Sequence, residues 1–138
     1  MNKNVVQEIY NRNYGSCKFY CREYCKSLIY TEGVLDFQKT LNAYWFVDLI
    51  ISKMKKVIDT YKTYDDGFFV IAIKFNKQNK CFLEIFREGY VNGEYCDHIT
   101  ILKEQIHETN LLVYNYKFYL ILSNYNPIQF TLLLTSEY

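Results

Sequence analysis

The chain has 138 residues and a mass of 16.7 kDa, which is the usual size of one folded domain. Its formal net charge is only +1, so the molecule as a whole has no general attraction to nucleic acid or to anionic membranes. The sequence contains no apolar run of the roughly 18 residues that a spanning helix needs, and residues 1–13 are polar. We therefore expect a single-domain protein of the cytoplasm.

Helical spacing of apolar residues comes first in the chain. Residues 5–13 predict a short helix that Gly15 ends, and residues 17–26 are the next helix candidate. From Val34 to Ile58 apolar side chains recur in the i, i+3, i+4, i+7 pattern of a helix with one buried face. Asn42 and Ala43 interrupt this pattern and predict two helices there rather than one.

Strand signals follow after residue 67. Apolar residues alternate from Phe69 to Phe75, and Asn92-Gly93 is a typical type I′ hairpin turn. The other segments that we expect to be strands are 81–86, 95–102, 111–114, 116–122 and 128–134, with residues 124–127 turning the last pair. The order predicts an α+β domain over residues 1–138, mainly helical in 1–66 and a β-meander in 67–138. In it, N-terminal helices pack on an antiparallel sheet of about four to six strands.

Charge is distributed unevenly along the chain. Residues 1–81 contain 13 Lys and Arg against 8 Asp and Glu, whereas the remainder is acidic. On a helix over residues 17–26, a cationic stripe would form at i, i+4 and i+8 with two tyrosines beside it; these residues are Lys18, Arg22, Lys26, Tyr20 and Tyr24. Such a stripe suits an acidic protein surface or RNA. The alternative is an ordinary solvated helix face.

A second basic group belongs to the following helix. We interpret Lys53 and Lys56, together with Lys55 and Lys62, as lying at its end, where cations also complement the helix dipole. Lys53 and Lys56 complete our predicted partner-binding or RNA-binding set.

Tyrosine is in excess, with 15 Tyr in a chain that is 19% aromatic. Tyrosines exposed at a surface favour protein partners. The ones that we expect to be exposed are Tyr10, Tyr14, Tyr20, Tyr24, Tyr61, Tyr64, Tyr90 and Tyr125. The alternative origin is coding bias, because residues with AT-rich codons (Asn, Lys, Tyr, Ile and Phe) predominate and only two alanines occur.

The five cysteines predict reduced thiols rather than a disulfide framework. Cys17, Cys21 and Cys25 recur every four residues and lack the knuckle spacing of a zinc site. We interpret them as small buried or half-buried side chains and predict no metal and no cofactor.

Motifs that carry chemistry are scarce. The sequence has no phosphate-binding glycine loop, no HExxH and no GxSxG. Cys96 and His98 would share one face of a strand, but a catalytic Cys-His pair normally comes from separate elements. Carboxylate pairs such as Glu84 with Glu88 have no pocket signature around them. We therefore predict no catalytic residue.

Three separated segments resemble the signatures of a family of small uncharacterised proteins carried by bacteria, phages, plasmids and other mobile elements. The segments are Tyr30-Thr31-Glu32-Gly33-Val34, Ala43-Tyr44-Trp45-Phe46-Val47-Asp48 and Leu132-Leu133-Leu134-Thr135-Ser136-Glu137-Tyr138. The resemblance covers residues 14–138, and the chain departs from the family pattern at Thr135 and at Leu41-Asn42. The family has no established activity. We expect its motif residues to be structural: Tyr30, Thr31, Gly33, Tyr44, Trp45, Asp48, Ser136, Glu137 and Tyr138.

Physical roles for these motif residues do not require a site. Thr31 can cap the helix that follows, and Gly33 fits its tight entry. Tyr44 and Trp45 are large enough to fill the core, and Asp48 can accept a hydrogen bond from a tyrosine, an indole or an amide. The last three residues can close the final strand onto the helices.

Three functions remain open at this point. The first, which the family resemblance favours, is a non-enzymatic anti-defence protein that binds a host CRISPR-Cas effector with its guide RNA, an anti-CRISPR protein. Its partner would be an RNA-targeting type VI effector, and the protein would block guide or target RNA binding or effector activity. The second is a module that binds RNA or another single strand, and the third is a small thiol-dependent enzyme. A homodimer is compatible with each.

Overall fold

The computed structural model describes residues 3–15, 18–107 and 109–138. Its helices are α1 (Lys3–Arg12), α2 (Glu32–Thr40) and α3 (Trp45–Tyr64), followed at the C-terminus by the 3-10 turn η1 (Thr135–Glu137). Its strands are β1 (Phe19–Arg22), β2 (Cys25–Thr31), β3 (Phe68–Phe75), β4 (Cys81–Val91), β5 (Glu94–Ile106), β6 (Tyr116–Tyr125) and β7 (Ile128–Leu134).

The described strands form one sheet of seven strands in the order β1-β2-β7-β6-β3-β4-β5. Neighbouring strands are antiparallel except β2 and β7, which are parallel. The α+β class predicted from the sequence is confirmed. The sheet is larger than the four to six strands expected because the N-terminal third of the chain contributes a hairpin to it.

That hairpin replaces the helix predicted over residues 17–26, and the prediction is wrong there. β1 and β2 are joined by a turn at residues 23–24, and side chains alternate along β1: Phe19 and Cys21 are exposed, while Tyr20 and Arg22 are half-buried. Aromatic and β-branched residues prefer strands, and pairing of β2 with β7 adds tertiary support. The cationic stripe therefore does not exist, and Cys17 lies outside the described residues.

Residues 111–114 are also not the strand expected from their apolar composition. They form an irregular loop before β6, in which Leu111 is buried. The Tyr116 hydroxyl donates a 2.9 Å hydrogen bond to the Leu112 carbonyl oxygen and so fixes the loop against the sheet. Leu111 therefore packs into the core without belonging to a strand.

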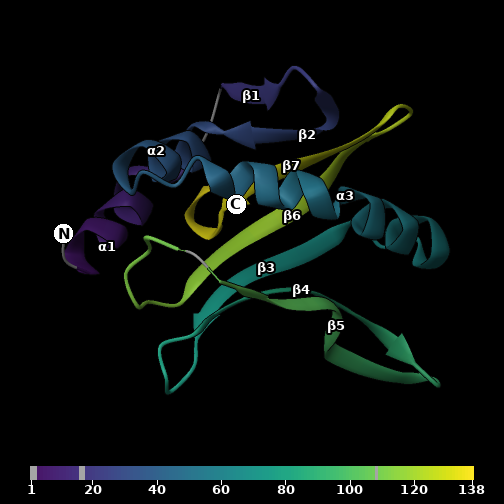
Figure 1. Ribbon diagram of the computed structural model, residues 1–138. Coiled ribbons are helices and arrows are strands. Elements are labelled where there is room, and N and C mark those ends of the chain that lie inside the picture. The colour runs from purple at the N-terminus through teal and green to yellow at the C-terminus, as the bar shows by residue number, and fades with distance from the viewer. Residues whose placement is uncertain (1–2, 16–17, 108) are drawn as a thin grey trace.

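Helices α2 and α3 lie across one face of the sheet (Figure 1). Helix α1 lies beside α2, near the start of β6 (Figure 1). Between α2, α3 and β6 an aromatic cluster forms the centre of the core. The ring of Phe37 lies 5.0 Å from that of Phe118 and 5.4 Å from that of Phe46, centroid to centroid. Among the described residues, no helix is long and apolar enough to cross a bilayer.

Two turns behave as the sequence predicts. Asn92 and Gly93 have φ values of 52° and 80°, which is the pair of positive φ angles that a type I′ turn requires. Asn42 has a φ of 52° and interrupts the helical conformation between α2 and α3. The β4–β5 hairpin that the first turn closes extends beyond the rest of the sheet (Figure 1).

Candidate functional site: the open face of the sheet

The first and last motif segments meet where α2 begins. Thr31 caps α2, because its hydroxyl accepts a hydrogen bond from the Val34 amide. The Glu137 carboxylate accepts from the Thr31 hydroxyl at 2.6 Å and from the Gly33 amide at 3.1 Å. A Cβ at Gly33 would lie 2.4 Å from that carboxylate, so any other residue here would displace the Glu137 side chain. These motif residues join β2, α2 and the C-terminal turn.

The middle motif segment differs in part from the prediction. Tyr44 is 46% exposed and so does not fill the core; Phe46, which is fully buried, does so instead. The half-buried Trp45 donates its indole N–H to Asn110 Oδ1 at 3.1 Å. Asp48 accepts one hydrogen bond from the Tyr24 hydroxyl, and this bond raises the pKa of the Tyr24 phenol above its usual value.

Arg22, predicted to contact a partner, is half-buried and bonded to other residues of the protein. Its guanidinium donates to the Tyr30 hydroxyl at 2.7 Å, to Gln38 Oε1 at 3.0 Å and to Asp48 Oδ1 at 3.3 Å. The ring of Tyr20 stacks on that of Tyr30 at 5.9 Å. These contacts fasten the β1–β2 hairpin to the helices, so the donors of Arg22 are engaged before any partner arrives.

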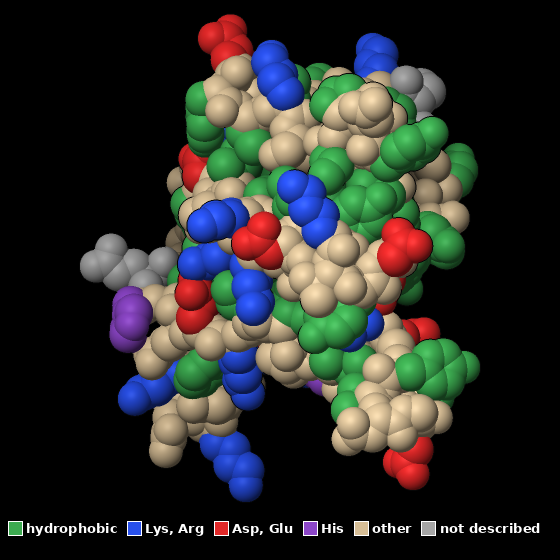
Figure 2. Space-filling view, turned by 90° about the vertical axis from the view of Figure 1, so that its right-hand side faces the viewer, with side chains coloured by type: hydrophobic (Ala, Val, Ile, Leu, Met, Phe, Trp, Pro, Cys, Tyr) green, Lys and Arg blue, Asp and Glu red, His purple; other side chains and the backbone are tan. Residues whose placement is uncertain are grey.

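The predicted basic residues do not form one surface. Lys18 and Lys26 are exposed on the β1–β2 hairpin, whereas Lys53 and Lys56 lie in the middle of α3 rather than at its end. The Lys53 ammonium pairs with Glu104 at 2.6 Å. Figure 2 shows the cations of one side of the molecule in separate groups.

The tyrosines predicted to be exposed divide into two groups. The exposed ones are Tyr14, Tyr24, Tyr64, Tyr90 and Tyr125, whereas Tyr10, Tyr20 and Tyr61 are half-buried. Tyr95 and Tyr138 are exposed without having been predicted. Packing at the sheet and helix surfaces, rather than residue type, decides between the groups.

The sheet has a second face that no described helix covers (Figure 1). Along β3, Phe69, Ile71 and Ile73 are fully buried against the helices. Phe68 and Val70 point to the opposite side, because successive side chains of a strand alternate between faces, and both remain partly exposed. We call this side of the sheet the open face.

The centre of the open face is apolar. Strand register places Leu133, Tyr119, Val70 and Phe86 in one row across β7, β6, β3 and β4, and Ile121 beside Phe68 in the next row. Together these residues are the apolar zone: Phe68, Val70, Phe86, Tyr119, Ile121 and Leu133. The C-terminal Tyr138 packs its ring at 5.5 Å from that of Phe68, while remaining 77% exposed. None of the apolar zone residues belongs to the main buried core cluster. Leu133 is itself buried, at 8% exposed, and the other members of the apolar zone are half-buried.

One end of the open face is basic. Register aligns Lys117, Ala72, Glu84 and Lys103 across four strands, and Lys74 lies beside Phe82 one step further along. The three lysines are exposed. We call Lys74, Lys103, Lys117 and Phe82 the basic zone. Its lysines come from three strands far apart in the sequence, so only the strand register reveals it.

Glu84 is the carboxylate inside this end of the sheet. It is 8% exposed and accepts hydrogen bonds from the Thr100 hydroxyl at 2.5 Å and from His98 Nε2 at 2.8 Å. Burial acts to raise the pKa of Glu84, but these hydrogen bonds and the Lys74 ammonium at 3.5 Å outweigh it and lower the pKa. The carboxylate is therefore ionised at neutral pH.

A hollow of about 380 Å³ lies at the base of the β4–β5 hairpin, lined by Phe68, Val70, Arg87, Tyr95 and their neighbours. Arg87 is 6% exposed; its Nη1 donates to Asp66 at 3.4 Å, and its guanidinium lies 4.2 Å from the Tyr64 ring centroid. The Nε of this side chain has no hydrogen-bond partner in the described structure. A guanidinium with one donor that is not hydrogen-bonded therefore borders an apolar hollow.

The tip of the same hairpin carries exposed tyrosines. Tyr90 is 73% and Tyr95 57% exposed, and their rings meet edge to face at 5.7 Å. The Tyr95 hydroxyl donates to Glu88 at 2.6 Å, and this hydrogen bond raises the pKa of Tyr95 to about 12. The tip is an aromatic projection next to the apolar zone.

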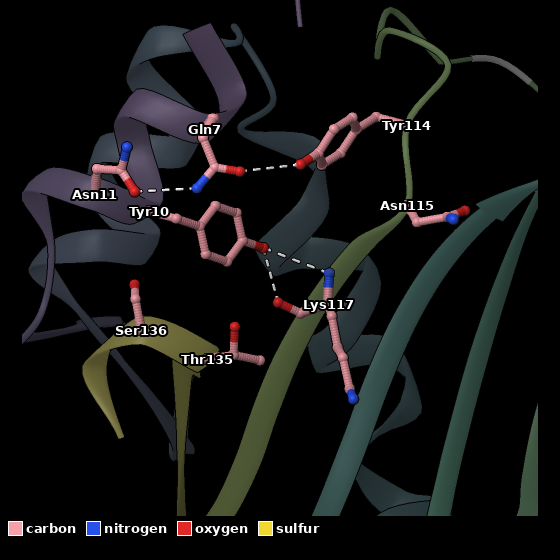
Figure 3. Close-up of a pocket in the computed structure, with 8 residues that line it drawn as sticks. All are labelled: Gln7, Tyr10, Asn11, Tyr114, Asn115, Lys117, Thr135 and Ser136. Atoms are coloured by element: carbon pink, nitrogen blue, oxygen red, sulfur yellow. Dashed lines mark hydrogen bonds between the residues drawn. The ribbon is translucent and has the colours of Figure 1, made fainter. Parts of the chain in front are cut away.

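A second hollow, of about 400 Å³, lies between α1, the loop before β6 and η1 (Figure 3). Its polar groups bond one another: the Tyr10 hydroxyl donates to the Lys117 carbonyl oxygen, Tyr114 donates to Gln7, and Gln7 donates to Asn11. Burial raises the pKa of Tyr10 well above its usual value. These groups serve packing, and we assign this hollow no ligand.

The thiols and the expected Cys–His pair have other partners. The Cys96 thiol donates to the His98 carbonyl oxygen at 3.5 Å, whereas the His98 ring bonds Glu84. Cys21, Cys25, Cys81 and Cys96 are free cysteines. In the described part of the chain, no group of three or more His, Cys, Asp or Glu is arranged to hold a metal ion.

Comparison with known proteins places the chain in a family. Residues 5–138 match a family of unknown function, DUF6876. The chain belongs to this family. No curated protein and no solved structure matches it. The DUF6876 match covers all three motif segments, whose residues join the ends of the fold as described above.

Proposed function

We propose that this chain is a non-enzymatic binding protein of a phage or other mobile element, and that it holds a protein partner on the open face of its sheet. The apolar zone carries this proposal. Apolar side chains that lie side by side and remain partly exposed are typical of an interaction site. Here they lie on the sheet face opposite the helices and outside the main core cluster.

The hairpin gives this face an anchoring point. Phe68 and Val70 belong to the apolar zone and also line the hollow beside Arg87. Tyrosine and arginine dominate the binding energy of many interfaces, above all beside a pocket. We therefore expect one side chain of the partner to enter this hollow, with Tyr90 and Tyr95 closing over it from the hairpin.

The edges of the sheet favour docking on the face rather than addition of a strand. The edge strand β5 has two register shifts against β4, and the other edge strand, β1, has one against β2 in only four residues. Bulges twist an edge away from a regular ladder and so protect it from pairing. A partner protein would therefore bind the side chains on the face of the sheet rather than pair with an edge strand.

For the identity of the partner, we propose a host CRISPR-Cas effector in the bacterial cytoplasm, with an RNA-targeting type VI effector as the first to test. The support is the resemblance to mobile-element proteins, together with the small size of the chain and its AT-biased composition. Inhibition would follow from occupation of a surface that the effector needs for guide or target RNA. The helical basic stripe gives no support, since residues 17–26 are a hairpin.

Native co-purification tests this proposal. The tagged protein is expressed in a bacterium that carries CRISPR systems and is purified with and without ribonuclease. We expect an effector at near-stoichiometric yield, and ribonuclease sensitivity would indicate that guide RNA is part of the surface bound. Recovery of no effector, or an unchanged cleavage activity at molar excess of the protein, would overturn the assignment.

A matched pair of variants tests the site itself. Phe68→Ser with Tyr95→Ser removes two aromatic rings from the open face and its hollow. Tyr14→Ser with Tyr125→Ser removes two rings that are more exposed and lie elsewhere. Loss of the partner with the first variant only, both being folded by circular dichroism, supports the open face; equal retention or equal loss contradicts it.

A further inference from the structure

The basic zone is not used by the proposed protein contact. Lys74, Lys103 and Lys117 come from β3, β5 and β6 and surround Ala72 and Glu84 on one end of the open face. The turn between β3 and β4 adds exposed Lys77 and Lys80 beyond Lys74. This concentration of cations is local, because the chain as a whole is nearly neutral.

The negative charge nearest these lysines is already engaged. Glu84 is 8% exposed, and its Oε2 accepts from both Thr100 and His98. Its second oxygen faces the Lys74 ammonium at 3.5 Å, in a contact that leaves the Lys74 side chain 53% exposed. The groups that a ligand meets first are thus the ammonium groups, and their field favours an anion.

Aromatic surface lies among these cations. The Lys103 ammonium is 5.8 Å from the ring centroid of Phe82. Lys74, Phe82 and Lys103 line a hollow of about 300 Å³ on the open face. A planar ring can stack on Phe82 in this hollow while a charged group attached to it reaches either lysine. Tyr119, two residues along β6 from Lys117, offers a further ring on the same face.

From this arrangement we infer that the basic zone binds a single-stranded polynucleotide, with phosphates at the three lysines and a base against Phe82. Alternation of cations and aromatic rings on a flat surface matches the alternation of phosphates and bases along a single strand. A duplex presents its phosphates but keeps its bases stacked inside, so it would use only part of this surface. The inference stands independently of the proposed protein partner.

Fluorescence anisotropy with a short labelled RNA, and with a DNA of the same sequence, over a series of salt concentrations tests the inference. For three phosphate contacts on a single strand, log affinity should fall with log salt with a slope of about −2. Lys74→Ala, Lys103→Ala and Lys117→Ala together should weaken binding at least about tenfold and flatten that slope. Phe82→Leu keeps apolar bulk, removes the stacking ring and should weaken binding several-fold without changing the slope.

Controls make the outcomes distinct. Lys55→Ala, Lys56→Ala and Lys62→Ala remove the same charge from exposed positions of α3 and should leave binding unchanged. Phe68→Ser with Tyr95→Ser should also retain binding, which separates this inference from the protein-docking proposal. RNA bound more tightly than DNA, or equally tightly, supports a single-strand site. No binding at low salt, equal loss with both lysine triples, or equal affinity for a hairpin duplex would overturn it.

Discussion

The two faces of strand β3 are similar in composition and opposite in their surroundings. Phe69, Ile71 and Ile73 are fully buried under the helices, whereas Phe68 and Val70, just as apolar, lie on the open face and are partly exposed. An apolar residue in this sheet can therefore serve either stability or recognition. The face it points to decides which, and that face follows from the alternation of the strand and the position of α2 and α3.

The largest expected effect comes from neighbouring residues of β6 that point to opposite faces. Phe118 is fully buried, with its ring centroid 4.5 Å from that of Phe46, whereas Tyr119 is half-buried on the open face. We expect Phe118→Ala to lower the free energy of unfolding by about 3–5 kcal/mol. Tyr119→Ala should lower it by about 1 kcal/mol or less.

Urea denaturation followed by circular dichroism measures both values. If the two variants lost equal stability, the comparison of the faces would fail, because Tyr119 would then be as well packed as the core. If the stability lost in Tyr119→Ala depended on protein concentration, a second copy of the chain would be the partner that covers Tyr119.

A smaller effect is expected from two carboxylates, one in the C-terminal turn and one in the β4–β5 hairpin. Glu137 accepts hydrogen bonds from Thr31, Gly33 and the Leu134 amide, all in the motif that joins α2 to the C-terminus. Glu137→Gln places an amide donor where these donors converge, and we expect a loss of about 1–3 kcal/mol. Glu88→Gln, at the exposed hairpin, should cost under about 0.5 kcal/mol.

Thermal unfolding of both variants provides the measurement. A Glu137→Gln protein as stable as the parent would remove the structural explanation of the last motif segment and leave its carboxylate available for another role. The Glu88→Gln protein controls for the removal of one charge.

Much of the fold follows from the sequence, because long periodic segments are informative. The helices α1, α2 and α3 were predicted from apolar spacing, and the Asn92-Gly93 turn from its residue types. The hairpin of β1 and β2 does not follow from the sequence. Cysteines and basic residues recur there every four positions without forming a helix, and the strands are instead stabilised because β2 pairs with both β1 and the distant β7. Local pattern carries no information about such a partner.

The site was less accessible to sequence reasoning than the fold. Lys18, Arg22 and Lys26 are close in sequence, yet Arg22 is engaged by Tyr30 and Gln38. The basic zone instead unites positions 74, 103 and 117, which only the register of β6, β3, β4 and β5 brings together. Basic residues that are close along the chain therefore do not form one surface, whereas basic residues of distant strands lie on the same face of the sheet.

The smallest expected effect concerns Glu84, the buried carboxylate that lies among the lysines of the basic zone. Its pKa is lowered in the folded protein, so its ionised form stabilises the fold at every pH above its unfolded pKa of about 4.3. That contribution is lost as the pH falls through the folded pKa. Glu84→Gln should therefore be less stable than the parent at neutral pH, by about 1 kcal/mol, and the difference should shrink under more acidic conditions.

Thermal unfolding of the parent and of Glu84→Gln between neutral and acidic pH tests this expectation, with the exposed Glu94→Gln as the control that should show no such trend. A difference that vanishes in acid means that Glu84 is charged in the folded state and offsets part of the lysine field. A difference that is independent of pH means that Glu84 has the same pKa in the folded and the unfolded protein, so that its hydrogen bonds and the Lys74 contact do not favour the ionised form.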